Sequence, residues 1–212
     1  YLDITQHEQL GHITAISRIE EERYVWLDKF TIRNLELFYS PYEGARTLID
    51  VLDKTVSPMG GRLLKRWISL PLKNLQPVND RLDIVAYLFE NKDVRDEVTG
   101  QIRQIGDLER LISKVAVGRI NPREVGQLRK ALLAIDPLKT LSMNSGCHPL
   151  SSLGEQLNPC RSVAEKIGRE LNTDPPVQVN RGNVIASGVS PELDELRTIL
   201  YSGKDYLVDL QN

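Results

Sequence analysis

The sequence predicts a mainly α-helical core domain with several helices, a small β element near residues 23–38 and a long C-terminal helix. Apolar residues recur at helical spacing, for example from Val125 to Ile135, and such a stripe is typical of a helix that covers a core. Three segments begin with a capping residue followed by proline, which favours a helix start: Ser57-Pro58, Asn121-Pro122 and Ser190-Pro191.

Residues 1–40 are expected to form an N-terminal helix followed by short strands. The helix is predicted over Ile4–Ile19, and the strands between Arg23 and Phe38, where β-branched and aromatic residues are frequent. Within the helix, His7 and His12 flank a sequence similar to the zinc-protease motif HExxH. The two histidines are one residue too far apart for that motif, which turns them about 140° from each other, so we expect no metal binding there.

Residues 41–172 are expected to form the helical core. After a turn at Pro41–Gly44, a short helix is predicted over Thr47–Leu52. Ser57-Pro58 begins a longer helix that Pro71 ends, and Pro77 opens the next one. The large apolar residues of these two longer helices are expected to face the interior: Leu63, Leu64, Trp67, Ile68, Leu82, Val85, Tyr87, Leu88 and Phe89.

A helical hairpin is predicted around Gly118, a residue that can adopt the positive φ that ends a helix. The first helix of the hairpin carries an apolar stripe at i, i+3, i+4 and i+7, formed by Leu108, Leu111, Ile112 and Val115. The second begins at Asn121-Pro122-Arg123-Glu124, where Asn121 caps it and Glu124 completes a capping box. Pro137 is expected to break or kink this second helix, with one more turn possible over Leu138–Met143.

The C-terminal part is expected to be a loop followed by a long helix. The loop covers 173–189, contains Pro175-Pro176 and includes a short strand at Asn183–Ala186. Ser190-Pro191 caps the last helix, which covers 190–212. One face of it carries Leu193, Leu196, Ile199 or Leu200, and Leu207.

The composition indicates one globular domain rather than a basic DNA-binding module. The 212 residues are 41% hydrophobic and 26% charged, which suffices for a substantial core. A net charge of −2 provides no overall positive field for DNA phosphates. Cys147 and Cys160 indicate neither a disulfide framework nor a metal clip, so we expect a reducing cytoplasm. We recognise no signal peptide and no run of ~20 apolar residues, and we expect no membrane association.

Seven short motifs follow one another along the chain: Thr31–Leu37 (TIRNLEL), Leu52–Ile68 with Pro71-Leu72, Arg81-Leu82-Asp83, Gly106–Leu111 (GDLERL), Gly118-Arg119, Asn121–Glu124 (NPRE) and Glu192–Arg197 (ELDELR). In this order they resemble the core domain of the MutS family of DNA mismatch repair proteins. The resemblance runs from Thr31 to the C-terminus, except for roughly 139–183. Ser57 stands where the family has threonine, which keeps the capping oxygen.

The resemblance implies that residues 1–212 form a MutS-type core domain whose last helix starts a lever. In that family the lever leaves the core towards a clamp that closes over DNA, and the core couples an ATPase to this clamp. A helix rises ~1.5 Å per residue and therefore suits the transfer of a displacement over tens of ångströms. For the residue pattern taken alone, packing in a helical bundle remains the simpler explanation of this helix.

The chain contains neither the motif for mismatch reading nor the motif for ATP hydrolysis that the resemblance implies for the family. Mismatch reading there rests on a Phe-x-Glu motif, which this sequence does not contain. ATP hydrolysis needs Gly-x-x-x-x-Gly-Lys-Ser/Thr, yet the one Gly-Lys pair, Gly203-Lys204, is followed by Asp205. The start at Tyr1 without methionine and the end at Asn212 within a helix are what a piece of a longer protein would show. We therefore expect this chain to be no enzyme.

By resemblance, other domains of the parent protein supply the partners and cofactors. The parent is expected to bind ATP and Mg, to bind mismatched duplex DNA, to dimerise and to interact with a MutL-type repair partner. For this chain the sequence assigns no catalytic, cofactor-binding or metal-binding residue, and it identifies no DNA-contacting residue.

Some residues allow both a functional and a structural interpretation. Gly60-Gly61 would admit a phosphate at a helix start or permit close packing against a neighbouring helix, and we favour packing. Arg62, Lys65 and Arg66 would contact DNA or pair with local carboxylates on a solvated face, and we favour the latter. Asp107 is explained by capping its helix.

Two alternative functions remain open at the level of the sequence. One is the core of a MutS paralogue that lacks the mismatch-reading domain and acts in other DNA transactions. The other is a helical scaffold for protein interactions without any link to DNA. The sequences on both sides of this chain in the parent reading frame would separate these alternatives.

Overall fold

The computed structural model describes the backbone of residues 21–211 and the side chains of residues 22–203. The helix predicted over Ile4–Ile19, with His7 and His12, lies outside the described residues. The chain divides into two compact units, which we describe separately. Unit 1 runs to Arg119 and includes Lys130–Pro159, and unit 2 consists of Ile120–Arg129 and Cys160–Asn212.

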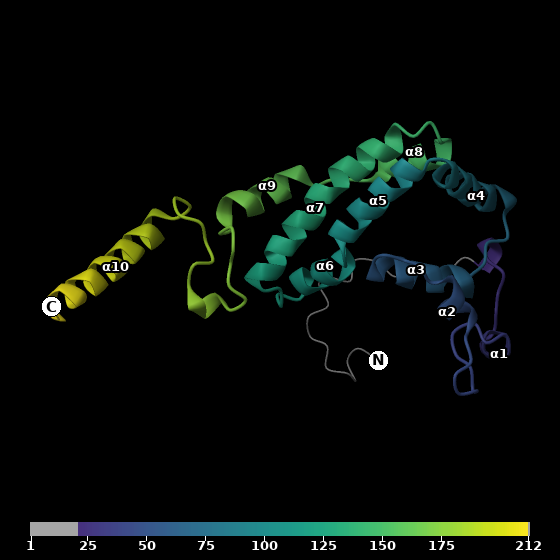
Figure 1. Cartoon of the computed structure of the whole chain (residues 1–212), viewed down its shortest axis with the longest axis horizontal. Coiled ribbons are helices and arrows are strands. Elements are labelled where there is room, and N and C mark those ends of the chain that lie inside the picture. Colours follow the sequence, from purple (N-terminus) through teal and green to yellow (C-terminus); the bar gives the residue numbers. More distant parts are fainter. Residues whose placement is uncertain (1–20, 212) are drawn as a thin grey trace. The chain divides into compact units, whose positions relative to one another are not determined.

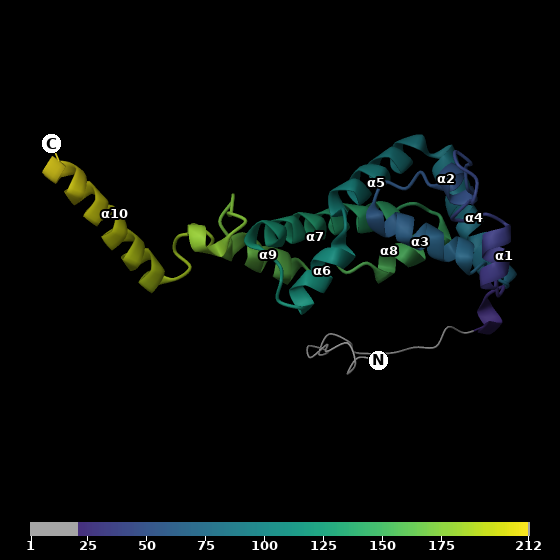
Figure 2. The same ribbon diagram turned by 90° about the horizontal axis from the view of Figure 1, so that it is seen from below.

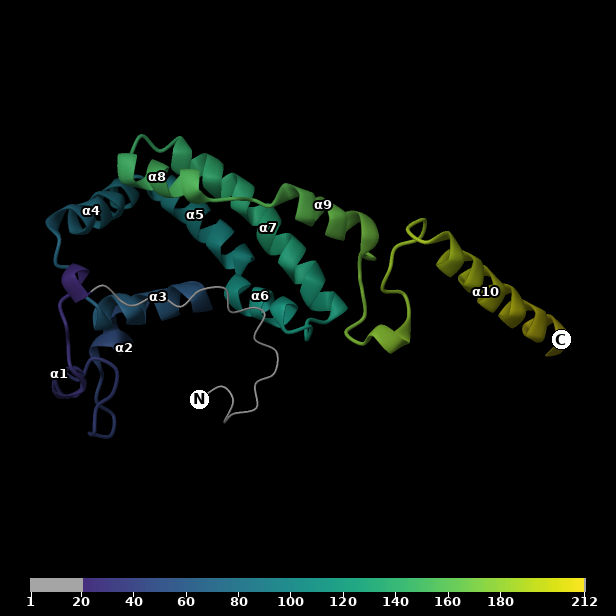
Figure 3. The same cartoon turned by 180° about the vertical axis from the view of Figure 1, so that it is seen from behind.

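The described residues form helices and loops, and the ribbon contains no strand within them (Figures 1, 2 and 3). Unit 1 holds α1 (Lys29–Asn34), α2 (Leu48–Leu52), α3 (Pro58–Ser69), α4 (Leu75–Glu90), α5 (Lys92–Ile105), α6 (Leu108–Ala116), most of α7 (Pro122–Met143) and α8 (His148–Gln156). Unit 2 holds the first turns of α7, then α9 (Arg161–Glu170), a 3-10 turn (Val179–Arg181) and α10 (Pro191–Gln211). The predicted mainly α-helical class is confirmed. In this part of the chain, no helix is long and apolar enough to cross a membrane.

The prediction of a small β element near residues 23–38 is wrong. Lys29–Asn34 forms α1, whose first turn is capped by Asp28: the Thr31 amide donates to Asp28 Oδ1 at 2.6 Å. Tyr24 pairs only with Leu72, in an isolated antiparallel bridge. The aromatic and β-branched residues of this segment do favour strands, but that preference depends on a neighbouring strand, and the cap at Asp28 favours a helix instead.

The helix starts predicted from capping residues are confirmed. The short helix predicted over Thr47–Leu52 is α2, and the structure adds a capping box of Thr47 and Asp50 at its start, with Thr47 N to Asp50 Oδ2 at 3.0 Å. Ser57 Oγ accepts from the Gly60 amide at 3.2 Å at the start of α3. At α7, the Glu124 amide donates to Asn121 Oδ1 at 2.9 Å and the Asn121 amide to Glu124 Oε2 at 3.2 Å. These contacts span three residues, so the sequence alone specifies them.

Helix α7 supplies much of the buried apolar surface. Of its predicted apolar stripe, Leu128, Leu132 and Ile135 are buried and Val125 is half-buried, and Ala131 and Ala134 are buried beside them. Pro137 does not end the helix, which continues to Met143. Gly118, with φ of 65°, lies between α6 and α7, so the positive φ predicted for this residue is confirmed. In α6, however, only Leu111 of the predicted stripe is buried, while Ile112 and Val115 are exposed.

The apolar residues expected to fill the core from α3 and α4 are largely exposed in the described structure. Leu63 and Trp67 of α3 and Leu82 and Val85 of α4 are exposed, and Phe89 is 80% exposed. Helix α4 contacts α5 and α8, and its Ile84, Tyr87 and Leu88 are half-buried. Helical periodicity reveals an apolar face but not the element that covers it, which is why the prediction of burial was wrong.

Three helices have no counterpart among the predicted elements. Helix α5 begins directly after Asn91, where α4 ends, and its sequence is rich in charged residues. Helices α8 and α9 lie in the stretch 139–183, where the sequence showed no family motif. In α8, Gly154 is buried against α7: a Cβ at this position would lie 2.8 Å from Ser142 Cβ and 3.2 Å from the Met143 nitrogen. At this contact the backbones of α7 and α8 therefore approach each other closely, without large apolar side chains between them.

Candidate functional site

The candidate site is the start of α10 in unit 2, together with the segment 184–188 that precedes it; we call this region the root of α10. Ser190 caps the helix as predicted, since its Oγ accepts from the Leu193 amide at 3.3 Å. The Asp194 amide donates to the Ser190 carbonyl at 3.0 Å. The helix thus begins at a defined residue.

Arg197 joins the first turns of α10 to the preceding segment. Its guanidinium donates from Nη1 to Asp194 Oδ1 at 2.9 Å and from Nη2 to the Ile185 carbonyl at 2.7 Å. Asp194 Oδ2 in turn accepts from the Gly188 amide at 2.6 Å. The Arg197 and Asp194 side chains are only 20% and 32% exposed, so water competes weakly for these bonds.

The segment held by Arg197 is itself fixed to the end of α9. Leu171 and Ile185 form an isolated antiparallel bridge. The Asn172 amide donates to the Val184 carbonyl at 2.9 Å, and the Ala186 amide donates to the Glu170 carbonyl at 2.9 Å. The strand predicted at Asn183–Ala186 is therefore present only as this short pairing, because no further strand extends it in the described residues. A continuous series of hydrogen bonds runs from α9 to Arg197.

Beyond its root, α10 exposes apolar side chains. Leu196, Ile199 and Leu200 are 63%, 60% and 62% exposed. Leu193 is half-buried, and Leu207 lies outside the described side chains. The apolar face predicted for this helix is therefore present in sequence but is not covered in unit 2. A cavity of about 390 Å³ lies beside the root, lined by Leu193, Arg197 and Leu200 from α10 and by residues 181–185 from the loop.

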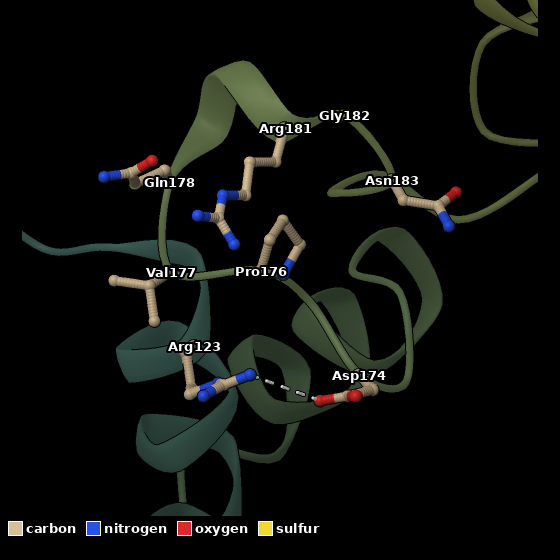
Figure 4. Close-up of a pocket in the computed structure, with 8 residues that line it drawn as sticks. All are labelled: Arg123, Asp174, Pro176, Val177, Gln178, Arg181, Gly182 and Asn183. Atoms are coloured by element: carbon tan, nitrogen blue, oxygen red, sulfur yellow. Dashed lines mark ion pairs between the residues drawn. The ribbon is translucent and has the colours of Figure 1, made fainter.

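A second cavity of unit 2, of about 560 Å³, lies between the first turn of α7 and the loop before the root. Figure 4 shows Arg123 on α7 facing Asp174, with which it forms an ion pair of 3.8 Å. Arg181 extends into the cavity from the opposite side, above Pro176 (Figure 4). This cavity combines two guanidinium groups with one carboxylate.

Unit 1 contains a polar cluster that joins α3 to α6. Arg62 donates from Nη2 to Asp107 Oδ1 at 2.6 Å, from Nη1 to Asp107 Oδ2 at 3.2 Å and from Nε to Glu109 Oε2 at 2.9 Å. The hydrogen bonds that Arg62 donates to Asp107 lower the pKa of Asp107, and the bonds it donates to Asp107 and Glu109 raise the pKa of Arg62. Asp107 also caps α6 by accepting from the Arg110 amide at 3.4 Å. The preferred structural interpretations of Arg62 and Asp107 are confirmed.

Replacing Arg62 by glutamine should lower the melting temperature at neutral pH and have less effect in acid. Because Arg62 lowers the pKa of Asp107 in the folded protein, the pair stabilises the fold when the carboxylate is charged. That stabilisation is present above pH ~4, the ordinary range of an aspartate, and is lost as the pH falls through the lowered pKa. Thermal unfolding of both proteins across this pH range measures the difference.

Arg66→Gln is the matched control, since Arg66 lies one turn further along the same helix and is exposed. It removes the same charge without touching Asp107 or Glu109. A melting-temperature difference for Arg62→Gln that equals the control at every pH would contradict the assignment.

Gly60 and Gly61 pack closely, as favoured, but against the preceding loop rather than a neighbouring helix. A Cβ on Gly60 would lie 3.3 Å from both Ser57 Oγ and Thr55 Cβ, and one on Gly61 would lie 3.4 Å from Thr55 Oγ1. Asp53 accepts from the Thr55 hydroxyl at 2.6 Å, and this bond and that of the Thr55 amide lower the pKa of Asp53.

Among the described residues, no group of three or more His, Cys, Asp or Glu side chains is arranged to hold a metal ion.

The sequence did not single out Arg197 or Asp194 as residues of a site. Both belong to the motif Glu192–Arg197, and their spacing of i and i+3 on a helix predicts a local ion pair. The bond from Arg197 to the Ile185 carbonyl joins residues twelve positions apart, so no local signal could have shown it.

Comparison with known proteins gives a consistent result. The family described as MutS domain III matches residues 30–211. Proteins called DNA mismatch repair protein MutS match the whole chain, with 57% identity in Phocaeicola vulgatus and 55% identity in Bacteroides fragilis. The protein of that name from Christiangramia forsetii is 53% identical over 98% of the chain. The chain spans 24% of the length of each of these relatives.

Proposed function

The chain belongs to the MutS family of DNA mismatch repair proteins, in which it corresponds to domain III, and we propose that it is a core domain whose α10 acts as the lever between an ATPase and a DNA clamp. Its role in this proposal is structural and allosteric. Motion would pass through the root of α10 because the root is where the helix is bonded to the rest of unit 2.

The observation that supports this proposal is the contrast between the root and the rest of α10. Arg197 and Asp194 bond the first turns to the Ile185 carbonyl and the Gly188 amide at 2.7 and 2.6 Å. The following residues Ile199 and Leu200 are exposed. A helix that is held firmly at its start, and whose next described side chains are exposed, transmits a rotation of its base along its length, since an α-helix is continuous in its backbone hydrogen bonds.

The wider activity proposed here is that of the parent protein. We propose that the parent recognises mispaired bases in duplex DNA, hydrolyses ATP with Mg, forms a dimer and interacts with a MutL-type repair partner. The curated relatives are called DNA mismatch repair proteins, which supports this assignment. We expect the protein to work in the cytoplasm, where the thiols of Cys147 and Cys160 would remain reduced.

The segment Gly203-Lys204-Asp205 does not fit a phosphate-binding loop for ATP and Mg. Gly203-Lys204-Asp205 lacks the hydroxyl residue that holds Mg in a phosphate-binding loop. It also lies within α10 rather than at the start of a helix, so its backbone amides are bonded within the helix. The nucleotide is therefore proposed to bind another domain of the parent.

Replacement of Arg197 by methionine in the full-length protein tests the proposal. The variant keeps the length of the side chain but removes the bonds to Asp194 and to the Ile185 carbonyl. Each such bond stabilises by ~1 kcal/mol, so we expect ATP-dependent release from mismatched DNA to slow about fivefold if one bond contributes to the coupling and about thirtyfold if both do. The measurement is the dissociation rate of labelled mismatched duplex after addition of ATP.

Arg169→Met is the control, because Arg169 is an exposed arginine of the same unit whose ion pair, among the described residues, is with its neighbour Glu170. Mismatch binding without ATP should be retained in both variants. Equal release rates for Arg197→Met, Arg169→Met and the parent would contradict a lever that works through this root.

A reading frame that carries Phe-x-Glu upstream and a phosphate-binding loop downstream of this chain would agree with a mismatch-sensing ATPase. The loop without Phe-x-Glu would instead indicate a paralogue that acts in other DNA transactions. A reading frame that contains neither motif would favour the scaffold function.

A further inference from the structure

The cavity between α7 and the loop before the root has features that the lever function does not use. It has a volume of about 560 Å³ and is lined by Arg123, Asp174, Pro176, Val177, Arg181 and neighbouring loop residues. Figure 4 shows the Arg181 guanidinium within the cavity and that of Arg123 at its edge, with Pro176 and Val177 between them.

The two arginines differ in how far their charge is already neutralised. Arg123 pairs with Asp174 at 3.8 Å, but Asp174 is 93% exposed, so this ion pair is weak. Arg181 forms no ion pair within the described part of the chain. The cavity therefore holds one carboxylate for two guanidinium groups and retains an excess positive charge.

We propose that this cavity binds the carboxylate side chain of an acidic peptide segment in a protein partner. Arg181 donates to the carboxylate, because a guanidinium presents two parallel N–H groups that match its two oxygens. Pro176 and the half-exposed Val177 accept an apolar residue next to the acidic one. This binding does not depend on α10 acting as a lever.

The surroundings favour a peptide over a nucleic acid. Between 172 and 190, Arg181 is the only cationic residue, so the loop offers no row of positive charges along which a phosphate backbone would lie. The nearby first turns of α10 carry Glu192, Asp194 and Glu195, which repel a polyanion. A short acidic segment needs only one or two cations and tolerates these neighbours.

Asp174 acts as an internal competitor in this proposal. In the absence of a partner, the Asp174 carboxylate pairs with Arg123. Because the Asp174 side chain is exposed, it can move away when the carboxylate of the partner binds. Removal of the Asp174 charge should therefore strengthen binding, whereas removal of the Arg181 charge should weaken it. A purely structural role of the loop would not produce opposite effects from these two exposed positions.

The experiment uses the full-length protein without nucleotide, at low salt, and a fluorescently labelled peptide of alternating glutamate and valine. Fluorescence anisotropy measures the Kd. Arg181→Gln should raise the Kd about fivefold, the loss expected for one charge-assisted contact at an exposed site. Asp174→Asn should lower it about twofold. Arg169→Gln, which removes an exposed charge elsewhere in unit 2, should leave it unchanged.

The proposal is overturned if Arg181→Gln and Arg169→Gln give the same Kd, or if Asp174→Asn weakens binding. It is also overturned if the peptide with glutamine in place of glutamate binds equally well. Loss of binding to an unlabelled matched duplex in Arg181→Gln, with peptide binding unchanged, would assign the cavity to nucleic acid instead.

Discussion

Replacement of Gly154 by alanine is expected to lower the free energy of unfolding by about 1–2 kcal/mol, although alanine is the better helix former. The added Cβ would lie 2.8 Å from Ser142 Cβ and 3.2 Å from the Met143 nitrogen. Both atoms belong to or adjoin the backbone of α7, so neither can move aside as a flexible side chain would. Overpacking of this kind costs ~1–3 kcal/mol, which exceeds the helix-propensity gain of up to ~1 kcal/mol.

The matched control for Gly154→Ala is Gly100→Ala in α5, where a Cβ meets nothing within 4 Å. Gly100→Ala gains the propensity without the contact and should stabilise by up to ~1 kcal/mol. Thermal unfolding followed by circular dichroism separates the two, because each kcal/mol shifts the melting temperature by ~2–4 °C at this chain length. A melting temperature that rises for both variants would refute the close contact between α7 and α8.

Replacement of Ile199 by proline is expected to abolish the response of the full-length protein to ATP on mismatched DNA. Proline removes the amide of residue 199 from the helix and clashes with the Glu195 carbonyl, which costs ~3 kcal/mol. The helix would kink or break just beyond the root, with Arg197 still bonded to Ile185. Release of mismatched duplex after ATP addition should slow at least tenfold, because motion at the root would no longer reach the far end of α10.

Ile199→Ala is the control at the same position. Ile199 is 60% exposed, so truncation to alanine removes little buried surface and keeps the helix. Its release rate should match that of the parent protein. ATP-dependent release that is unaffected by Ile199→Pro would exclude the lever, even if Arg197→Met had slowed release by another route.

The predictions that held were those in which a few neighbouring residues determine the result. Ser57, Asn121 and Ser190 each cap a helix by bonding to an amide three residues ahead. Leu128, Leu132 and Ile135 are buried along one face of α7, as their spacing predicts. The motif series identified the family for the same reason, since it is read directly from consecutive residues.

The predictions that failed concerned the environment of a segment rather than its own conformation. The residues of 23–38 favour strands, yet a strand needs a partner, and only Leu72 pairs with Tyr24. Phe89 and Leu82 have the spacing of core residues but lie exposed on α4. Helix α5 was missed because its many charged residues obscure the apolar pattern from which helices are predicted.

The sequence by itself determined the helical class, most helix starts and the family of this protein, because capping, periodicity and motifs act within a few residues. Only the tertiary structure decided which helix faces are covered. It also decided that Arg62 forms an ion pair with Asp107, that Gly154 packs against Ser142 and that Arg197 donates to the Ile185 carbonyl. These contacts join residues that are distant in sequence. Their geometry depends on how helices pack, and side-chain pattern along one helix does not specify its neighbour.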